Sequence, residues 1–197
     1  MRLPKSAHTS LPWRIHELTR DFSVEDVWSF RTPGAGPGDF PAMLEATRAA
    51  GGPAALRGPA RFLFALRWRL GALFGWDRVS SGLGRRVTSI RDRLPDDLRA
   101  APRGPESASL PLRPVYELER ESARELANGT VHAVMHLGWV PGAKGDHELR
   151  MAVLVRPNGR FGRLYLAAIA PFRYLVVYPA LTRQWERAWR AHLRRTS

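Results

Sequence analysis

Two runs of alternating apolar and polar residues stand out in the C-terminal third of the chain. They extend over Gly129–Val140 and His147–Arg156, and both are rich in β-branched or aromatic residues. Successive side chains of a strand point to opposite faces, so each run has one apolar face and one mixed face. The residues between them, Pro141–Asp146, have the composition of a loop. The pattern predicts an antiparallel β-hairpin that ends at Pro157, because proline cannot continue a central ladder.

The register of this hairpin decides which side chains share a face. His132 and His136 alternate with other residues and therefore lie on the same face of the first strand. A shift of one residue in the pairing decides whether that face also carries Arg150 or carries Met151 instead. The pattern leaves both registers open.

A long helix is predicted after the hairpin. The run Gly162–Leu181 is nearly all apolar, but Arg173 lies close to its centre. A charge at the middle of a membrane-spanning helix costs several kcal/mol, so we interpret the run as a buried core helix. Pro171 is expected to kink this helix because it removes a backbone hydrogen bond.

The end of the predicted helix is amphipathic. Leu181, Trp185 and Trp189 recur at helical spacing on one side. The opposite side carries four arginines: Arg183, Arg187, Arg190 and Arg194.

The residues upstream of the hairpin are less periodic. Helices are predicted from Ser23 to about Phe30, where Ser23 and Asp26 fit a capping box, over Phe40–Ala50 and over Pro59–Phe74, with a short one after Pro95. Strands are predicted within Leu11–Leu18 and Leu112–Glu119, a loop over Thr32–Asp39, and a turn or helical stub over Ser122–Ala127.

Composition narrows the possible functions. The chain has 197 residues and no cysteine, which excludes disulfides, thiolate nucleophiles and cysteine metal sites. Its N-terminus lacks the apolar core of a signal peptide, and we expect a cytoplasmic protein. The formal net charge is +13, and all but two of the basic residues are arginine. Such a positive charge attracts phosphate groups, although the arginine excess can also reflect a GC-rich codon bias or serve solubility alone.

His132 and His136 are the most conspicuous candidates for chemistry. Four residues of extended chain separate them by about 13 Å, which is too far for two ligands of one metal ion. We therefore expect no metal site, and no cofactor motif is present. The two histidines either line a pocket or are structural residues of a partly hydrated face. Tyr116 and Tyr165 bring hydroxyl groups into apolar surroundings, where they either orient a ligand or satisfy a neighbouring group.

Several segments of the chain resemble one known family. They are His132–Pro141, Met151–Gly159, Tyr165–Arg173 and Tyr178–Pro179, together with Ser6–His8, Pro12–His16 and Asp92–Pro95. Through them nearly the whole chain resembles the domain-of-unknown-function family 2867 (DUF2867). That family is similar to START-like (SRPBCC) helix-grip proteins, which include polyketide cyclases and plant pathogenesis-related proteins. The resemblance implies an α+β fold in which an antiparallel sheet grips a long kinked C-terminal helix, with a cavity between them. It implies no catalytic residues.

We therefore expect a single domain over residues 1–197 that binds a small apolar or aromatic molecule between the sheet and the C-terminal helix. The candidate lining residues are Tyr116, His132, His136, Arg150 and Tyr165. The alternative is a module that binds acidic surfaces, either nucleic acid or an anionic membrane, through Arg183, Arg187, Arg190 and Arg194. The sequence does not decide whether the protein catalyses a reaction.

Overall fold

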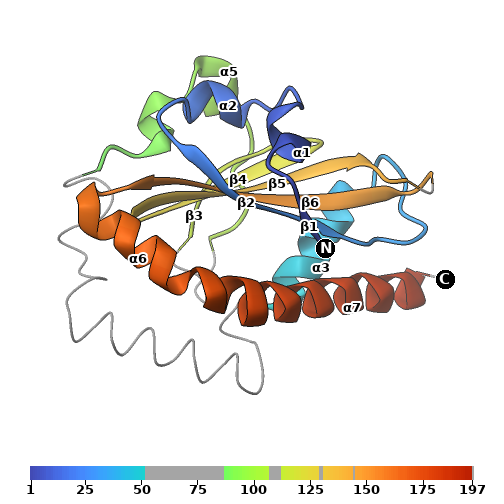
Figure 1. Cartoon of the computed structure of the whole chain (residues 1–197). Helices are drawn as coiled ribbons and strands as arrows, with labels where there is room; N and C mark the ends of the chain where they lie inside the picture. Colours follow the sequence, from blue (N-terminus) through green and yellow to red (C-terminus); the bar gives the residue numbers. More distant parts are fainter. Residues whose placement is uncertain (52–86, 107–111, 129–130, 144, 197) are drawn as a thin grey trace.

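The computed structural model describes residues 1–51, 87–106, 112–128, 131–143 and 145–196 (Figure 1). The helix predicted over Pro59–Phe74 lies outside these residues. The predicted α+β class is confirmed, since an antiparallel sheet carries a long C-terminal helix on one face.

The sheet has six strands in the order β1-β2-β6-β5-β4-β3, and every pairing is antiparallel. The strands are β1 (Arg2–Leu3), β2 (Ser23–Phe30), β3 (Arg113–Glu117), β4 (Glu121–Ala127), β5 (Val131–Pro141) and β6 (His147–Pro157). β5 and β6 form the predicted hairpin at its centre. His136 pairs with Ala152 and Gly138 pairs with Arg150, so the face with the two histidines carries Arg150 and not Met151.

The helices lie on both faces of this sheet (Figure 1). The short elements α1 (Ser6–Thr9), α2 (Ile15–Leu18), η3 (Ile90–Arg93) and α5 (Asp96–Ala100) lie on one face. The helix α3 (Phe40–Ala50) and the long C-terminal helix lie on the other. The long helix consists of α6 (Gly159–Phe172), a π-helical turn η4 (Arg173–Val177) and α7 (Tyr178–Thr196).

Each face has its own apolar core. On the side of α7, buried aromatic side chains fill the space against the sheet: Trp28, Phe30, Phe40, Trp139, Tyr178, Trp185 and Trp189. On the side of α2, Ile15 and Leu18 pack with Leu98, Val115 and Val134. The alternation of β5 divides its side chains between the two cores, as the sequence pattern predicts.

Three predicted elements are wrong. The segment Ser23–Phe30 is strand β2 and not a helix, and it contains a β-bulge between Val24 and Asp26. The segment Ser122–Ala127 belongs to strand β4 and is neither a turn nor a helical stub. The strand predicted within Leu11–Leu18 is a loop followed by the single turn of α2, whose residues Ile15 and Leu18 are both buried.

The prediction of a buried core helix over Gly162–Leu181 is half right. The segment is helical, and Pro171 lies inside α6, directly before the π-turn. It is not buried, because Leu164 and Leu175 are 68% and 77% exposed. Only one side of α6 packs on the sheet, where Leu166 and Ile169 contact a small cluster around Val131 and Val155.

Candidate functional site

The structure separates the residues predicted to line a ligand cavity. Tyr116, His132 and His136 are fully buried, and they lie on the face of the sheet opposite to α7. Arg150 is half-buried on that same face, where its Nη1 donates to the carbonyl oxygen of Ala7. Tyr165 lies on α6, so the five residues do not surround one space beneath the C-terminal helix.

His136 belongs to a buried hydrogen-bonded chain that links α1 to strands β3, β4 and β5. Its Nε2 lies 2.8 Å from Glu121 Oε2, and its Nδ1 lies 3.1 Å from His8 Nε2. The hydroxyl of Tyr116 donates to the same glutamate oxygen, and the backbone N–H of Arg14 donates to the other. The network satisfies the carboxylate on both oxygens, as a buried carboxylate requires.

The electrostatics of this chain keep both imidazole rings neutral. Burial, with a smaller effect of the neighbouring rings of His136 and His16, lowers the pKa of His8 to about 3. Burial also lowers the pKa of His136, although Glu121 opposes that shift. Burial acts to raise the pKa of Glu121, but hydrogen bonds, first of all from His136, bring it below its usual value. Glu121 is therefore the charged group of the chain. The neutral rings of His136 and His8 connect it to α1 by hydrogen bonds.

His132 belongs to a second cluster of the same design. Its Nε2 lies 2.9 Å from Glu125 Oε2, which also accepts from the backbone N–H of Ile90. The hydroxyl of Ser89 donates to the other oxygen of Glu125. This glutamate is fully buried and fixes the start of η3 on the sheet.

Both glutamates were missed in the sequence, because no strand was expected over Glu121–Ala127. A signal for them is present. Glu121 and Glu125 are four residues apart on β4, and His132 and His136 are four residues apart on the antiparallel neighbour β5. That spacing brings each glutamate to one histidine. These contacts pair each histidine with a buried glutamate and indicate a structural role. One pair connects α1 to the sheet, and the other connects η3 to it.

A third polar cluster lies on the other face, at the β-bulge of β2. The extra residue, Glu25, and its neighbour Asp26 both contact the guanidinium of Arg173 from the π-turn, at 3.2 Å each. The hydroxyl of Tyr178 donates to Asp26 Oδ2 at 2.8 Å. Burial and then the Asp26 carboxylate raise the pKa of Tyr178 well above its usual value, so this hydroxyl keeps its proton.

Asp26 is the residue of this cluster that points to a ligand. It is 1% exposed, and its Oδ1 is buried without a hydrogen-bond partner among the residues that the structure describes. The hydroxyl of Tyr174 lies close to the same carboxylate, since burial and then Asp26 raise the pKa of Tyr174. Buried polar atoms are nearly always hydrogen-bonded, so each exception asks for an explanation. Bulges of this kind are also over-represented beside active sites, where they redirect a side chain.

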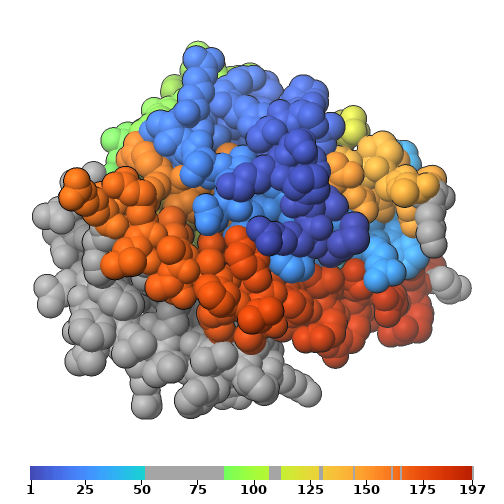
Figure 2. Space-filling view, viewed as in Figure 1, coloured from blue at the N-terminus to red at the C-terminus, as the bar shows by residue number. Residues whose placement is uncertain are grey.

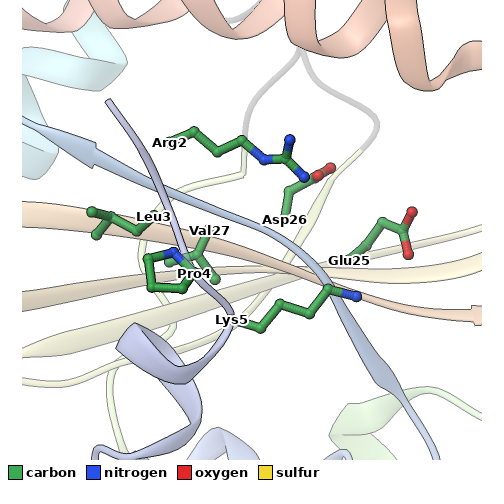
Figure 3. Close-up of a pocket in the computed structure, with 7 residues that line it drawn as sticks. All are labelled: Arg2, Leu3, Pro4, Lys5, Glu25, Asp26 and Val27. Carbon is green, nitrogen blue, oxygen red and sulfur yellow. The ribbon is translucent and has the colours of Figure 1, made fainter.

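A pocket of about 350 Å³ lies directly at Asp26 (Figure 3). Its walls come from the N-terminal segment and from the bulge: Arg2, Leu3, Pro4, Lys5, Glu25, Asp26 and Val27. In Figure 3 the side chain of Arg2 points toward the carboxylate of Asp26. The guanidinium of Arg2 also lies over the ring of Tyr174, 4.3 Å from its centre. The pocket therefore combines two carboxylates with the cations of Arg2 and Lys5.

The four arginines predicted to bind anions are all exposed on α7: Arg183, Arg187, Arg190 and Arg194. The opposite side of α7 is buried on the sheet through Leu181, Trp185 and Trp189. By length and composition, the helix Gly162–Thr196 could cross a membrane. Its contacts instead attach it to the sheet, through Arg173 and through the buried side of α7.

Within the described residues, no three His, Asp or Glu side chains are grouped in a way that could hold a metal ion. Comparisons with curated proteins and with solved structures found no match. A family model matches residues 18–180, which include strands β2 to β6, α6 and the π-turn. The chain therefore belongs to DUF2867, a family described as proteins of unknown function.

Proposed function

We propose that this protein binds a small zwitterionic molecule in the pocket at Asp26. The observation that carries the proposal is Asp26, a residue of the pocket wall whose buried Oδ1 has no hydrogen-bond partner among the described residues. An ammonium or hydroxyl group of a ligand would supply the missing donor. Ligand sites commonly place a few polar groups of this kind in a concave surface of similar size.

The remaining charges favour a ligand that also carries an anionic group. Arg2 and Lys5 are exposed at the pocket, whereas Arg173 is already paired with Glu25 and Asp26. An anionic group on the ligand would pair with Arg2 or Lys5 while its donor reaches Asp26. A volume of about 350 Å³ corresponds to roughly a dozen water molecules at about 30 Å³ each, so the ligand has about a dozen non-hydrogen atoms.

This proposal modifies the START-like expectation of an apolar ligand held between the sheet and the C-terminal helix. The space between α7 and the sheet is filled by aromatic side chains such as Trp139 and Trp185. The pocket lies at the edge of that layer instead, beside the π-turn that carries Arg173. We accordingly propose a polar ligand at the kink of the long helix.

Three matched probes test the charge requirement: 6-aminohexanoate, hexanoate and hexylamine. Ligand-observed NMR of the full chain is expected to detect 6-aminohexanoate, which carries both charges, at lower concentration than either singly charged analogue. The variants Arg2→Gln and Lys5→Gln change exposed residues, so the fold is retained, and each is expected to weaken binding about fivefold or more. Arg20→Gln, an exposed arginine outside the pocket, is the control. Equal binding of all three probes, or equal binding by all variants, would contradict the proposal.

A further inference from the structure

The exposed side of the long C-terminal helix carries an apolar stripe in its first half, next to the exposed Arg160 and Arg163. Leu164, Ala168, Pro171 and Leu175 follow one another at steps of three or four residues, and all are exposed. That spacing places them on one stripe of a helix. An exposed apolar stripe on a surface helix is a feature that needs a partner.

The second half of the same helix is basic on its exposed side. In an uninterrupted α-helix, with about 100° of rotation per residue, Arg183 would lie roughly 120° around the axis from Pro171. The π-turn at Arg173–Val177 accommodates one extra residue and removes about 100° of that rotation. The arginines therefore continue the line of the apolar stripe, as their common exposure indicates.

This combined stripe crosses the molecule along one side. Figure 2 shows α6 and α7 as a continuous band, orange to red, across this view of the molecule. The opposite side of the helix is held on the sheet by Leu181, Trp185 and Trp189, so the stripe cannot turn inward. The exposed residues of the helix therefore keep fixed positions relative to the sheet.

We propose that this stripe is a docking surface for an anionic lipid bilayer. The apolar half would insert its leucines at the level of the acyl chains, while the four arginines pair with lipid phosphates and carboxylates. Arg183, Arg187, Arg190 and Arg194 supply the charge complementarity with an anionic leaflet. The surface is distinct from the Asp26 pocket, so the two proposals stand or fall separately.

The apolar half is what distinguishes a bilayer from a nucleic acid. A nucleic acid would use the arginines for its phosphates and would gain from aromatic side chains on which bases stack. The two tryptophans of α7 are buried against the sheet and are not available for stacking. Leu164 and Leu175 give no advantage with a phosphate backbone, whereas a bilayer buries them.

The test is flotation of the full chain with vesicles of phosphatidylcholine that contain about one-third phosphatidylserine. We expect binding that falls steeply between low and high salt, and no binding to pure phosphatidylcholine. Replacement of the four arginines by glutamine is expected to lower the partition coefficient at least 100-fold, at about fivefold per arginine. The control replaces four exposed arginines of other segments in the same way: Arg20, Arg103, Arg113 and Arg120.

The leucines decide between a bilayer and a general polyanion. The double variant Leu164→Asn/Leu175→Asn is expected to lower vesicle binding at least tenfold and to leave binding to heparin unchanged. The pair Leu164→Met/Leu175→Met keeps the apolar surface and is expected to retain binding. The proposal is overturned if the control arginine variant loses as much binding as the helix variant. It is also overturned if the asparagine pair binds vesicles as tightly as the wild type, which would make the surface a polyanion site.

Discussion

His8 gives a quantitative prediction about acid stability. Its ring is 2% exposed between His136 and His16, and its pKa in the folded protein is about 3. In the unfolded chain a histidine titrates near 6.5. Below that pH the unfolded chain binds a proton that the folded protein does not bind. His8 therefore does not lower the free energy of unfolding above pH 6.5, but it lowers that free energy progressively as the pH falls from 6.5 toward 3.

The size of this effect follows from the two pKa values. Each pH unit between them costs about 1.4 kcal/mol, so the 1.5 units between pH 6.5 and pH 5 correspond to about 2 kcal/mol from His8 alone. The variant His8→Gln cannot titrate, but its amide can still donate to His136 Nδ1. The loss of unfolding free energy between pH 8 and pH 5 is expected to be about 2 kcal/mol smaller in this variant than in the wild type.

Urea denaturation at the two pH values, followed by tryptophan fluorescence, measures this difference. The control is His192→Gln, because His192 lies on α7, on the face of the sheet opposite to His8. This control is expected to keep the wild-type dependence on pH. Equal pH dependence of His8→Gln and the wild type would refute the conclusion that His8 is held neutral by its surroundings.

Three substitutions test the packing of the polar clusters, each by urea denaturation. Gly138→Ala is expected to lower stability by about 1–3 kcal/mol, because the new Cβ would lie 2.7 Å from Cζ2 of Trp13; an unchanged midpoint would contradict the close approach. Tyr178→Phe is expected to cost about 1–3 kcal/mol, since it takes a donor from the buried carboxylate of Asp26; an unchanged midpoint would show that this hydrogen bond does not stabilise the fold. Glu125→Gln is expected to cost at least as much, because it removes the charged acceptor between Ser89 and His132, and a neutral result would show that the charge is unimportant.

The alternating pattern of β5 and β6 predicted the central hairpin because both strands are regular and divide two apolar cores. The pattern alone does not determine the register, because both strands carry residues on each face that can be buried. It is decided by distant partners, such as His8, which meets His136 across the sheet face. Such a contact joins residues 128 positions apart in the chain and leaves no local signal.

Strand β2 was mistaken for a helix because Ser23 and Asp26 have the spacing of a capping box, and the apolar spacing that follows does not contradict it. Val24 and Val27 lie three residues apart, which is typical of a helix, yet both pack on the same face of the sheet. The bulged Glu25 accounts for the shift in periodicity. Asp26, one of the two residues that suggested the capping box, lies at this bulge and in the wall of the pocket, so the prediction failed where the candidate site lies.

Strand β4 was missed because it contains Glu121 and Glu125, and glutamate is rare in buried strands. They are tolerated there because histidines of the next strand donate to them. The two histidines were recognised as a pair from the sequence, but their partners and the face on which they lie depend on tertiary pairing. The predicted ligand cavity therefore combined these histidines with Tyr165, although the fold places the histidines on one face of the sheet and the helix of Tyr165 on the other.

The central claim, a ligand at Asp26, is tested most directly by native mass spectrometry of the protein purified from its own host. The wild type is expected to carry a bound molecule of roughly a dozen non-hydrogen atoms that disappears on denaturation. The double variant Arg2→Gln/Lys5→Gln, which keeps the buried cluster intact, is expected to have lost it, and Arg20→Gln is expected to retain it. An empty wild type, or the same bound mass in the double variant, would contradict the claim.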